Sequence, residues 1–286
     1  MKTFKIVSLR NKIREVKRVI LLLAVLCATQ SLSAAYFVNG IYYDINSTTQ
    51  EAYVTSGYSY YSGTVNIPTQ VTITDFGTTK TYRVTKISIM AFAGSTGLTS
   101  VNIPSSIKEI GVQAFYNCSS LTSLTIPNTV TTMGTDVTFY GCSSLTSVTL
   151  PNCVTSIGGR AFYGCSNLTS VNIPNNVTSI GQEAFYNCSS LTSLTLPNNV
   201  TTIGKSAFEG CSSLTSLTLP NNVTTMGERA FYGCSSLTSM NIPNNVTTMG
   251  ERAFYNCSGL KEVTIGSSVT EIGGSAFDGC SSLTTI

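Results

Sequence analysis

The sequence predicts a mainly β, right-handed solenoid. About nine coils of 23 residues stack their strands into a parallel sheet on a concave face, and a β cap covers the N-terminal end. Three observations predict this fold: a repeat that recurs from Phe92 onward, strand-like apolar alternation inside each repeat, and a tyrosine-rich segment with a hairpin signal before the first repeat. Because repetition overrides the usual estimate of domain number from length, the 286 residues are interpreted as coils and not as globular domains.

Residues 1–35 have the three-part order of a secretory signal peptide. Seven of the sixteen basic residues lie in the first eighteen positions, and the apolar run 19–28 and a small, polar stretch ending at Ala35 follow them. Ten apolar residues are too few to span a bilayer. We therefore expect cleavage after Ala35, a secreted or cell-surface location and no transmembrane span in the exported chain, with a retained membrane anchor as the alternative.

The predicted exported chain, residues 36–286, is mildly acidic, with nine basic and twelve acidic residues. Sequence-independent binding of nucleic acid depends on clustered Lys and Arg side chains that neutralise phosphates. The basic cluster belongs to the predicted signal peptide, so nucleic acid is not an expected partner.

Residues 36–86 are expected to form the N-terminal β cap and a lengthened first coil. Asn39-Gly40 lies between two strand-like runs and is a strong hairpin signal. A solenoid needs a cover over its first coil, and residues 36–62 are assigned to it. Residues 87–286 are expected to form the solenoid. The sequence stops at Ile286, inside a predicted strand, so we expect a fragment, or alternatively an open edge that pairs with another molecule.

Each coil combines one clear strand with two bends. Leu191, Leu194 and Leu196 follow the pattern L-x-x-L-x-L, whose alternation indicates a strand, and Pro197 ends it because proline cannot donate to a ladder. A second inward apolar pair, a glycine that allows a bend and an Ala-Phe pair complete the coil. One cysteine marks each repeat, with a spacing of 23, or 24 where an extra residue falls within residues 134–138. These cysteines are Cys118, Cys142, Cys165, Cys188, Cys211, Cys234, Cys257 and Cys280.

The full pattern, C-x-x-L-x-x-[VIL]-x-[IL]-P-x-x-V-x-x-I-G-x-x-A-F, runs continuously from Ile87 to the C-terminus. It resembles the BspA-like leucine-rich repeats of bacterial surface proteins, and residues 63–73 and 81–92 look like the lengthened first turn of that family. The resemblance implies a leucine-rich-repeat solenoid and adhesion to host or matrix proteins or contact with other cells.

The residues offer little for catalysis. Histidine is absent, which removes the commonest general base and a leading metal ligand. Glu228 and Glu251 occupy equivalent sites in adjacent coils, but Arg229 and Arg252 follow them directly, so we interpret them as a solvated charge ladder. We therefore expect no catalytic residues, no cofactor and no enzyme activity.

The repeated cysteines are expected to be buried thiols packed as small apolar groups. Stacked cysteines form a line and not a tetrahedron, which disfavours zinc. Parallel side-chain vectors leave the Cβ atoms farther apart than a disulfide needs. Cys153 replaces a turn asparagine, and we expect it to be exposed and free.

Two surface rows are candidate binding sites. The first row consists of the tyrosine directly after the core phenylalanine of a repeat. These tyrosines either bind a partner or cover the phenylalanine row: Tyr116, Tyr140, Tyr163, Tyr186, Tyr232 and Tyr255. The second is the outward side of the predicted strands on the concave face, which either makes weak multivalent contacts or maintains solubility: Ser123, Thr125, Ser147, Thr149, Ser170, Asn172, Ser193, Thr195, Ser216, Thr218, Ser239 and Asn241.

From these features we expect an adhesin-like secreted or cell-surface protein. It would bind extracellular proteins of a matrix or host surface through its repeated ladders. The alternative is a carbohydrate-binding surface protein that uses tyrosines as sugar-stacking platforms. An extracellular enzyme is the least supported class.

Overall fold

The computed structural model describes residues 35–286, so the predicted signal peptide lies outside the described residues. Tyr36–Ile286 forms one compact unit. Every regular element of that unit is a β-strand, and the predicted bends between the strands are turns. In the described part of the chain there is no helix long and apolar enough to cross a membrane.

An antiparallel meander begins the described part of the chain. Strands β1 (Tyr36–Val38) and β2 (Ile41–Asn46) form a hairpin, and β2 pairs with β3 (Glu51–Val54). Between β1 and β2, Asn39 and Gly40 have φ values of 50° and 83°. Both values are positive, as a type I′ turn requires, so the hairpin predicted from this dipeptide is present.

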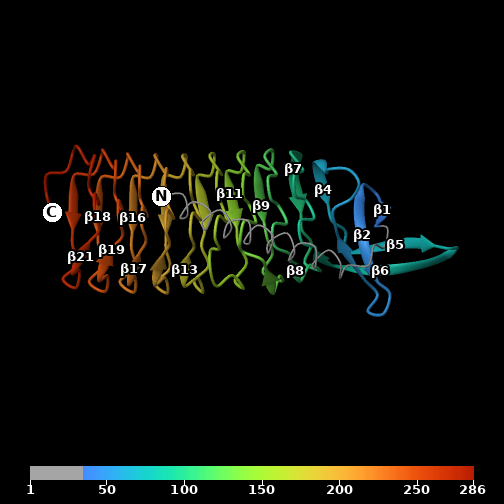
Figure 1. Cartoon of the computed structure of the whole chain (residues 1–286). Coiled ribbons are helices and arrows are strands. Elements are labelled where there is room, and N and C mark those ends of the chain that lie inside the picture. Colours follow the sequence, from blue (N-terminus) through green and yellow to red (C-terminus); the bar gives the residue numbers. More distant parts are fainter. Residues whose placement is uncertain (1–34) are drawn as a thin grey trace, which may run out of the picture. The chain divides into compact units, whose positions relative to one another are not determined.

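A second hairpin extends from the end of the solenoid that carries β1, β2 and β3 (Figure 1). It consists of β5 (Gln70–Asp75) and β6 (Thr78–Ile87), whose outward threonines form cross-strand hydroxyl pairs. The inner part of β6 lies between β3 and β8 (Glu109–Ile110) and is parallel to both. The meander is thus hydrogen-bonded into the first coils.

Phe76 at the tip of this hairpin is in an unfavourable conformation. Its φ is 45° and its side chain is fully exposed. A positive φ crowds the Cβ atom of most residues, whereas asparagine tolerates it. We expect Phe76→Asn to raise the free energy of unfolding by about 1 kcal/mol, measured by urea denaturation. Gly77→Ala, at φ 78°, should lower it. A stability loss on Phe76→Asn would show that Phe76 contributes a contact absent from this structure.

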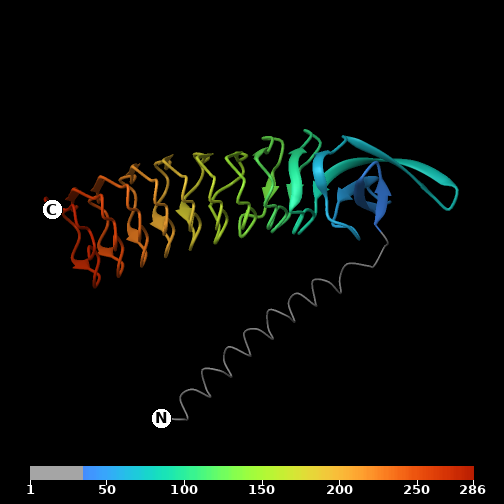
Figure 2. The same ribbon diagram turned by 90° about the horizontal axis from the view of Figure 1, so that it is seen from above.

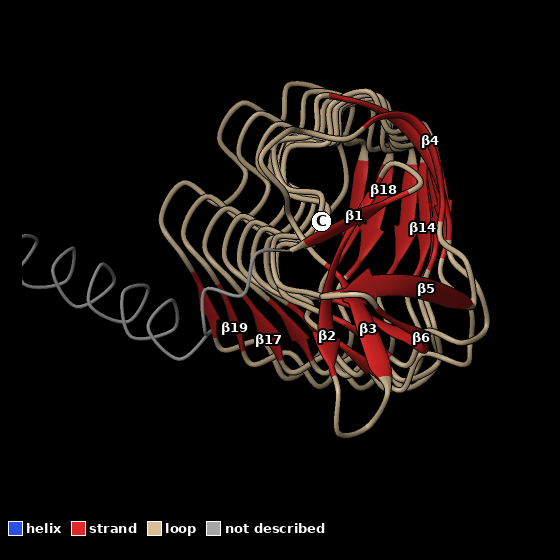
Figure 3. Cartoon of the chain, turned by 90° about the vertical axis from the view of Figure 1, so that its right-hand side faces the viewer, coloured by secondary structure: helices blue, strands red, loops and turns tan. Residues whose placement is uncertain are grey.

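Two rows of parallel strands follow the axis of the solenoid. Figure 3 looks along this axis and shows the strands on two sides of each coil, with loops on the remaining perimeter. The first row, here called the strand face, comprises β4 (Ser62–Asn66), β7 (Gly97–Asn102), β9 (Ser123–Thr125), β11 (Ser147–Thr149), β12 (Ser170–Asn172), β14 (Ser193–Thr195), β16 (Ser216–Thr218), β18 (Ser239–Asn241) and β20 (Glu262–Thr264).

The strand face pairs equivalent residues of successive coils. For example, Leu194 of β14 lies opposite Leu217 of β16. In every one of these strands from β9 onward, the central apolar residue is buried between two outward residues. The strand predicted from L-x-x-L-x-L is confirmed.

The second row consists of two-residue strands that the sequence pattern shows only as an inward apolar pair. Its parallel pairing begins with β6 and β8 and is interrupted after β10, where Ile157 forms only a single bridge to Ile180. This interruption follows the one 24-residue repeat. Beyond β8, the row comprises β10 (Thr132–Met133), β13 (Ser179–Ile180), β15 (Thr202–Ile203), β17 (Thr225–Met226), β19 (Thr248–Met249) and β21 (Glu271–Ile272).

Hydrogen bonds also join the coils where there is no strand. The amide of Phe185 donates to the carbonyl of Ala207 in the next coil at 2.8 Å, and the equivalent phenylalanines repeat this bond. The phenylalanine rings form a continuous stack inside the solenoid, with successive centroids 5.1–5.7 Å apart and planes within 12° of parallel. The stacked coils are visible from above in Figure 2.

The glycine of each I-G or M-G pair has a different role from the predicted bend. An added Cβ at Gly204 would lie 2.6 Å from the carbonyl carbon of Gly181 in the preceding coil, and one at Gly227 would lie 2.5 Å from the amide nitrogen of Lys205. Neither glycine has a positive φ. These glycines therefore permit close approach of neighbouring backbones.

Candidate functional site

The cysteine row is a hydrogen-bonded internal ladder. Each thiol donates to the carbonyl of the phenylalanine in the preceding coil, at 3.0–3.2 Å between Sγ and O. All eight are buried and free, so the predicted burial is confirmed and the hydrogen bond adds to it. Burial raises the pKa of Cys118, Cys165 and Cys211 to about 12.

Cys153 does not have the predicted exposure. Its side chain is half-buried and packs against the core, and burial raises the pKa of its thiol. In the next coil, the equivalent Asn176 instead extends its amide to the carbonyl of Asn152. Cysteine lacks an amide for this contact, and its small apolar side chain turns toward the core.

Native-state alkylation tests the cysteine ladder. Only the thiolate reacts, and a pKa near 12 leaves about one thiolate in ten thousand at pH 8. We expect iodoacetamide to spare Cys165 and Cys211 in the folded protein and to label both in denaturant, as read by peptide mass spectrometry. Cys153 should react before either. Rapid native labelling of Cys211 would contradict the buried ladder.

The tyrosine row forms a half-exposed ring stack on the turn side of the coils. Tyr116, Tyr140, Tyr163 and Tyr186, here called the tyrosine strip, lie with successive ring centroids 5.0, 4.7 and 4.6 Å apart and with nearly parallel planes. Tyr232 and Tyr255 form a separate pair at 5.0 Å. The structure therefore places the six sequence-predicted tyrosines in two groups.

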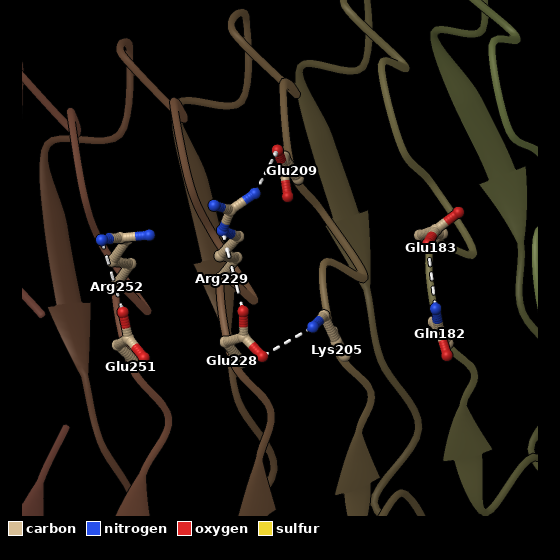
Figure 4. Close-up of polar contacts among 8 residues, drawn as sticks. All are labelled: Gln182, Glu183, Lys205, Glu209, Glu228, Arg229, Glu251 and Arg252. Atoms are coloured by element: carbon tan, nitrogen blue, oxygen red, sulfur yellow. Dashed lines mark hydrogen bonds and ion pairs between the residues drawn. The ribbon is translucent and has the colours of Figure 1, made fainter. Parts of the chain in front are cut away.

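Glu209 and Arg229 occupy the interval between the two groups. The carboxylate of Glu209 lies 4.0 Å from Arg229 Nη1 (Figure 4). The guanidinium of Arg229 lies 5.4 Å from the ring centroid of Tyr232. The row therefore changes from aromatic to charged at this coil.

Ion pairs between neighbouring coils lie on the same side of the solenoid as the tyrosine row. Arg160 Nε donates to Glu183 at 2.6 Å, and Lys205 Nζ donates to Glu228 at 2.6 Å. The hydrogen bond from Arg160 lowers the pKa of Glu183, and the one from Lys205 lowers the pKa of Glu228. Ionised carboxylates held in this way do not serve as proton donors at neutral pH.

Within single coils, Glu228 and Arg229 lie 3.8 Å apart and Glu251 and Arg252 3.5 Å apart (Figure 4). The charge ladder predicted from these residues is therefore present, and it extends to Lys205 in the preceding coil. Within residues 35–286, no group of three His, Cys, Asp or Glu side chains is arranged to hold a metal ion.

The strand face is polar and shallowly hollowed. Its twelve predicted residues are exposed, except for half-exposed Ser147. Hollows of about 350 and 330 Å³ lie over β14–β16 and over β12–β14. In the adjacent row, threonines such as Thr169 and Thr215 donate their hydroxyls to the preceding coil.

Stacked coils with an L-x-x-L-x-L strand every 23 residues define a leucine-rich-repeat protein. The chain belongs to the BspA type leucine rich repeat family, whose repeat region matches in six copies over residues 69–192 and 155–284. The resemblance inferred from the sequence pattern is confirmed. No curated protein sequence matches the chain.

Two of the similar solved structures are of bacterial proteins. A leucine-rich repeat protein of T. pallidum is 26% identical, covers 79% of this chain and 90% of its own, and has a TM-score of 0.51. A leucine rich cell surface protein of Faecalibacterium prausnitzii is 25% identical, with 90% and 95% coverage and a TM-score of 0.42. The likeness to the T. pallidum protein supports the leucine-rich-repeat fold.

Proposed function

We propose that this chain is an exported, adhesin-like cell-surface protein that binds extracellular proteins through the tyrosine strip. The family to which it belongs comprises bacterial surface proteins, and the signal-peptide pattern of residues 1–35 supports export. The observation that carries the proposed binding role is the stack of four half-exposed tyrosines beside the Arg160–Glu183 pair.

The chemistry of the tyrosine strip suits a protein partner. Tyrosine and arginine are enriched at protein interfaces and at their energetic hot spots. Stacking covers the ring faces of Tyr140 and Tyr163 on both sides, because each has a parallel ring on either side at 4.6–5.0 Å. The strip therefore presents ring edges and hydroxyls, which disfavours sugar stacking on these two tyrosines.

Repetition supports adhesion by avidity. Equivalent tyrosines in successive coils offer several similar contacts on one rigid scaffold, so a partner with repeated sites binds more tightly than any single contact allows. The absence of histidine and the pairing of Glu183 and Glu228 with basic residues favour binding over catalysis.

The test is binding of the full chain to immobilised fibronectin, laminin and collagen, measured by surface plasmon resonance. For any probe that binds, we expect Tyr163→Ala to weaken binding by about 30-fold, which corresponds to the roughly 2 kcal/mol of a hot-spot residue. Tyr163→Phe, which keeps the ring stack, should lose less. Thr195→Ala on the strand face is the control and should bind normally.

Binding to none of the three probes, or equal binding by the Tyr163→Ala variant and the original chain, would contradict the proposal. Circular dichroism melting of each variant separates loss of binding from loss of fold.

A further inference from the structure

The N-terminal cap contains a groove that the tyrosine strip does not share. Its volume is about 380 Å³, within the range of about 300–1,000 Å³ for small-molecule sites. The groove lies between the β1–β2 hairpin, the loop before β4 and β4 itself. Its lining is uncharged throughout. It includes four aromatic residues, Phe37, Tyr42, Tyr60 and Tyr61, together with Asn39, Ser62 and Asn66.

Two of the four aromatic rings of the groove, those of Phe37 and Tyr60, are unusually exposed. Phe37 is 61% exposed and Tyr60 is 76% exposed. Burial of such rings is worth about 2 kcal/mol each, so soluble proteins do not usually present them together without a binding role. Unlike the rings in the middle of the tyrosine strip, Tyr60 is not stacked between aromatic rings. Its ring lies beside Gly94, where an added Cβ would be 3.0 Å from Tyr60 Cε1.

The floor of the groove is rigidly supported. Phe37 contacts Tyr42 at 4.6 Å between centroids, Tyr42 contacts Tyr61 at 6.1 Å, and Tyr61 contacts Phe92, the first ring of the core stack, at 4.8 Å. The buried Tyr61 hydroxyl accepts from the amide of Tyr42 at 3.0 Å and donates to the carbonyl of Thr55 at 2.7 Å.

The loop that carries Tyr60 is held at both ends. Tyr42 and Ser59 hydroxyls lie 3.1 Å apart, and the amide of Tyr61 donates to Ser95 Oγ at 3.1 Å. Hydrogen bonds on both sides of Tyr60 fix the backbone from which its ring projects. The groove is therefore preorganised, which lowers the entropic cost of binding.

We propose that this groove binds a neutral oligosaccharide. A pyranose ring has an apolar C–H face, which would lie on Tyr60 or Phe37, and a rim of hydroxyls, which would bond to Asn39, Ser62 and Asn66. An uncharged lining matches a neutral ligand, because acidic glycans and nucleotides need basic groups to offset their charge. This site adds glycan recognition to the proposed protein binding and occupies a different surface.

The experiment is isothermal titration calorimetry of the full chain with cellohexaose, chitohexaose, maltohexaose and laminarihexaose. A heparin-derived hexasaccharide serves as the anionic comparison. We expect at least one neutral hexasaccharide to bind and the anionic one not to bind. For that neutral ligand, Tyr60→Ala and Phe37→Ala should each reduce the affinity at least about tenfold.

Tyr58→Ala is the matched control, because Tyr58 lies in the same loop, is 90% exposed and is outside the groove. It should bind the sugar normally, as should Tyr163→Ala in the tyrosine strip. Tyr60→Ala should in turn leave protein binding unchanged, so failure of one proposal is distinguishable from failure of the other. Absence of heat with all four neutral ligands, preference for the anionic one, or equal losses in Tyr58→Ala and Tyr60→Ala would overturn the proposal.

Discussion

Replacement of Gly158 by alanine is expected to lower the free energy of unfolding by about 3 kcal/mol, because the coils have no room for one more carbon atom. An added Cβ would lie 2.6 Å from the carbonyl carbon of Thr135 and 2.7 Å from the amide nitrogen of Asp136 in the preceding coil. These are backbone atoms, so relief requires the backbone of the preceding coil to move away. Urea denaturation followed by circular dichroism measures the change.

The neighbouring glycine is the control for this prediction. An added Cβ at Gly159 would be 3.7 Å from its nearest atom, which is ordinary contact, and its φ is not positive. The equivalent residues of later coils, such as Gln182 and Lys205, carry long side chains. Gly159→Ala should therefore change stability by less than about 0.5 kcal/mol. Equal effects at Gly158 and Gly159 would mean that the coils do not approach as closely as described.

Phe185→Ala is expected to cost about 3–5 kcal/mol, the usual range for removing a buried aromatic ring. Phe185 is fully buried and stacks at 5.2 Å on Phe162 and at 5.4 Å on Phe208. The backbones above and below are tied by hydrogen bonds, so the cavity closes only partly. In a solenoid each coil contacts only its neighbours, so the loss also weakens coupling between the coils on either side.

The matched control for the cavity is Tyr186→Ala, one residue along. Its half-exposed ring loses stacking but leaves no enclosed cavity, so its cost should be about 1 kcal/mol. The unfolding transition of Phe185→Ala should also broaden or divide, because the two halves lose coupling at the central coil. A cost below that of Tyr186→Ala would contradict a continuous phenylalanine core.

The strand face was predictable because its signals are local. The alternation of Leu194 and Leu196 and the stop at Pro197 lie within a few residues, and Asn39-Gly40 predicts its hairpin without help from the rest of the chain. The two-residue strands of the second row, such as Thr202–Ile203, are too short to show any period.

The positive φ values of some residues depend on contacts between coils. Ser206 and Arg229 have φ values of 53° and 55°, although neither residue type favours this conformation. Their amides donate to the carbonyls of Glu228 and Glu251 in the next coil at 2.8 and 2.9 Å. The contact between coils therefore stabilises a local geometry that no single repeat indicates.

Some contacts between coils follow directly from the repeat length. Lys205 and Glu228, like Arg160 and Glu183, are 23 residues apart, one repeat length, so their pairing follows from the register. The cap groove is different, because its lining comes from three segments whose approach depends on the meander and on β4. Sequence spacing alone does not bring Phe37 and Tyr60 together.

The central claim is that successive repeats occupy successive coils of one parallel stack. Spin labels at Thr125 and Thr218, four coils apart, and at Thr125 and Thr264, six coils apart, test it by pulsed electron resonance on a Cys153→Ser background. With strands about 4.8 Å apart, the separations should be roughly 19 and 29 Å. The buried native thiols should remain unlabelled. Separations that do not increase with the number of intervening repeats would contradict the stack.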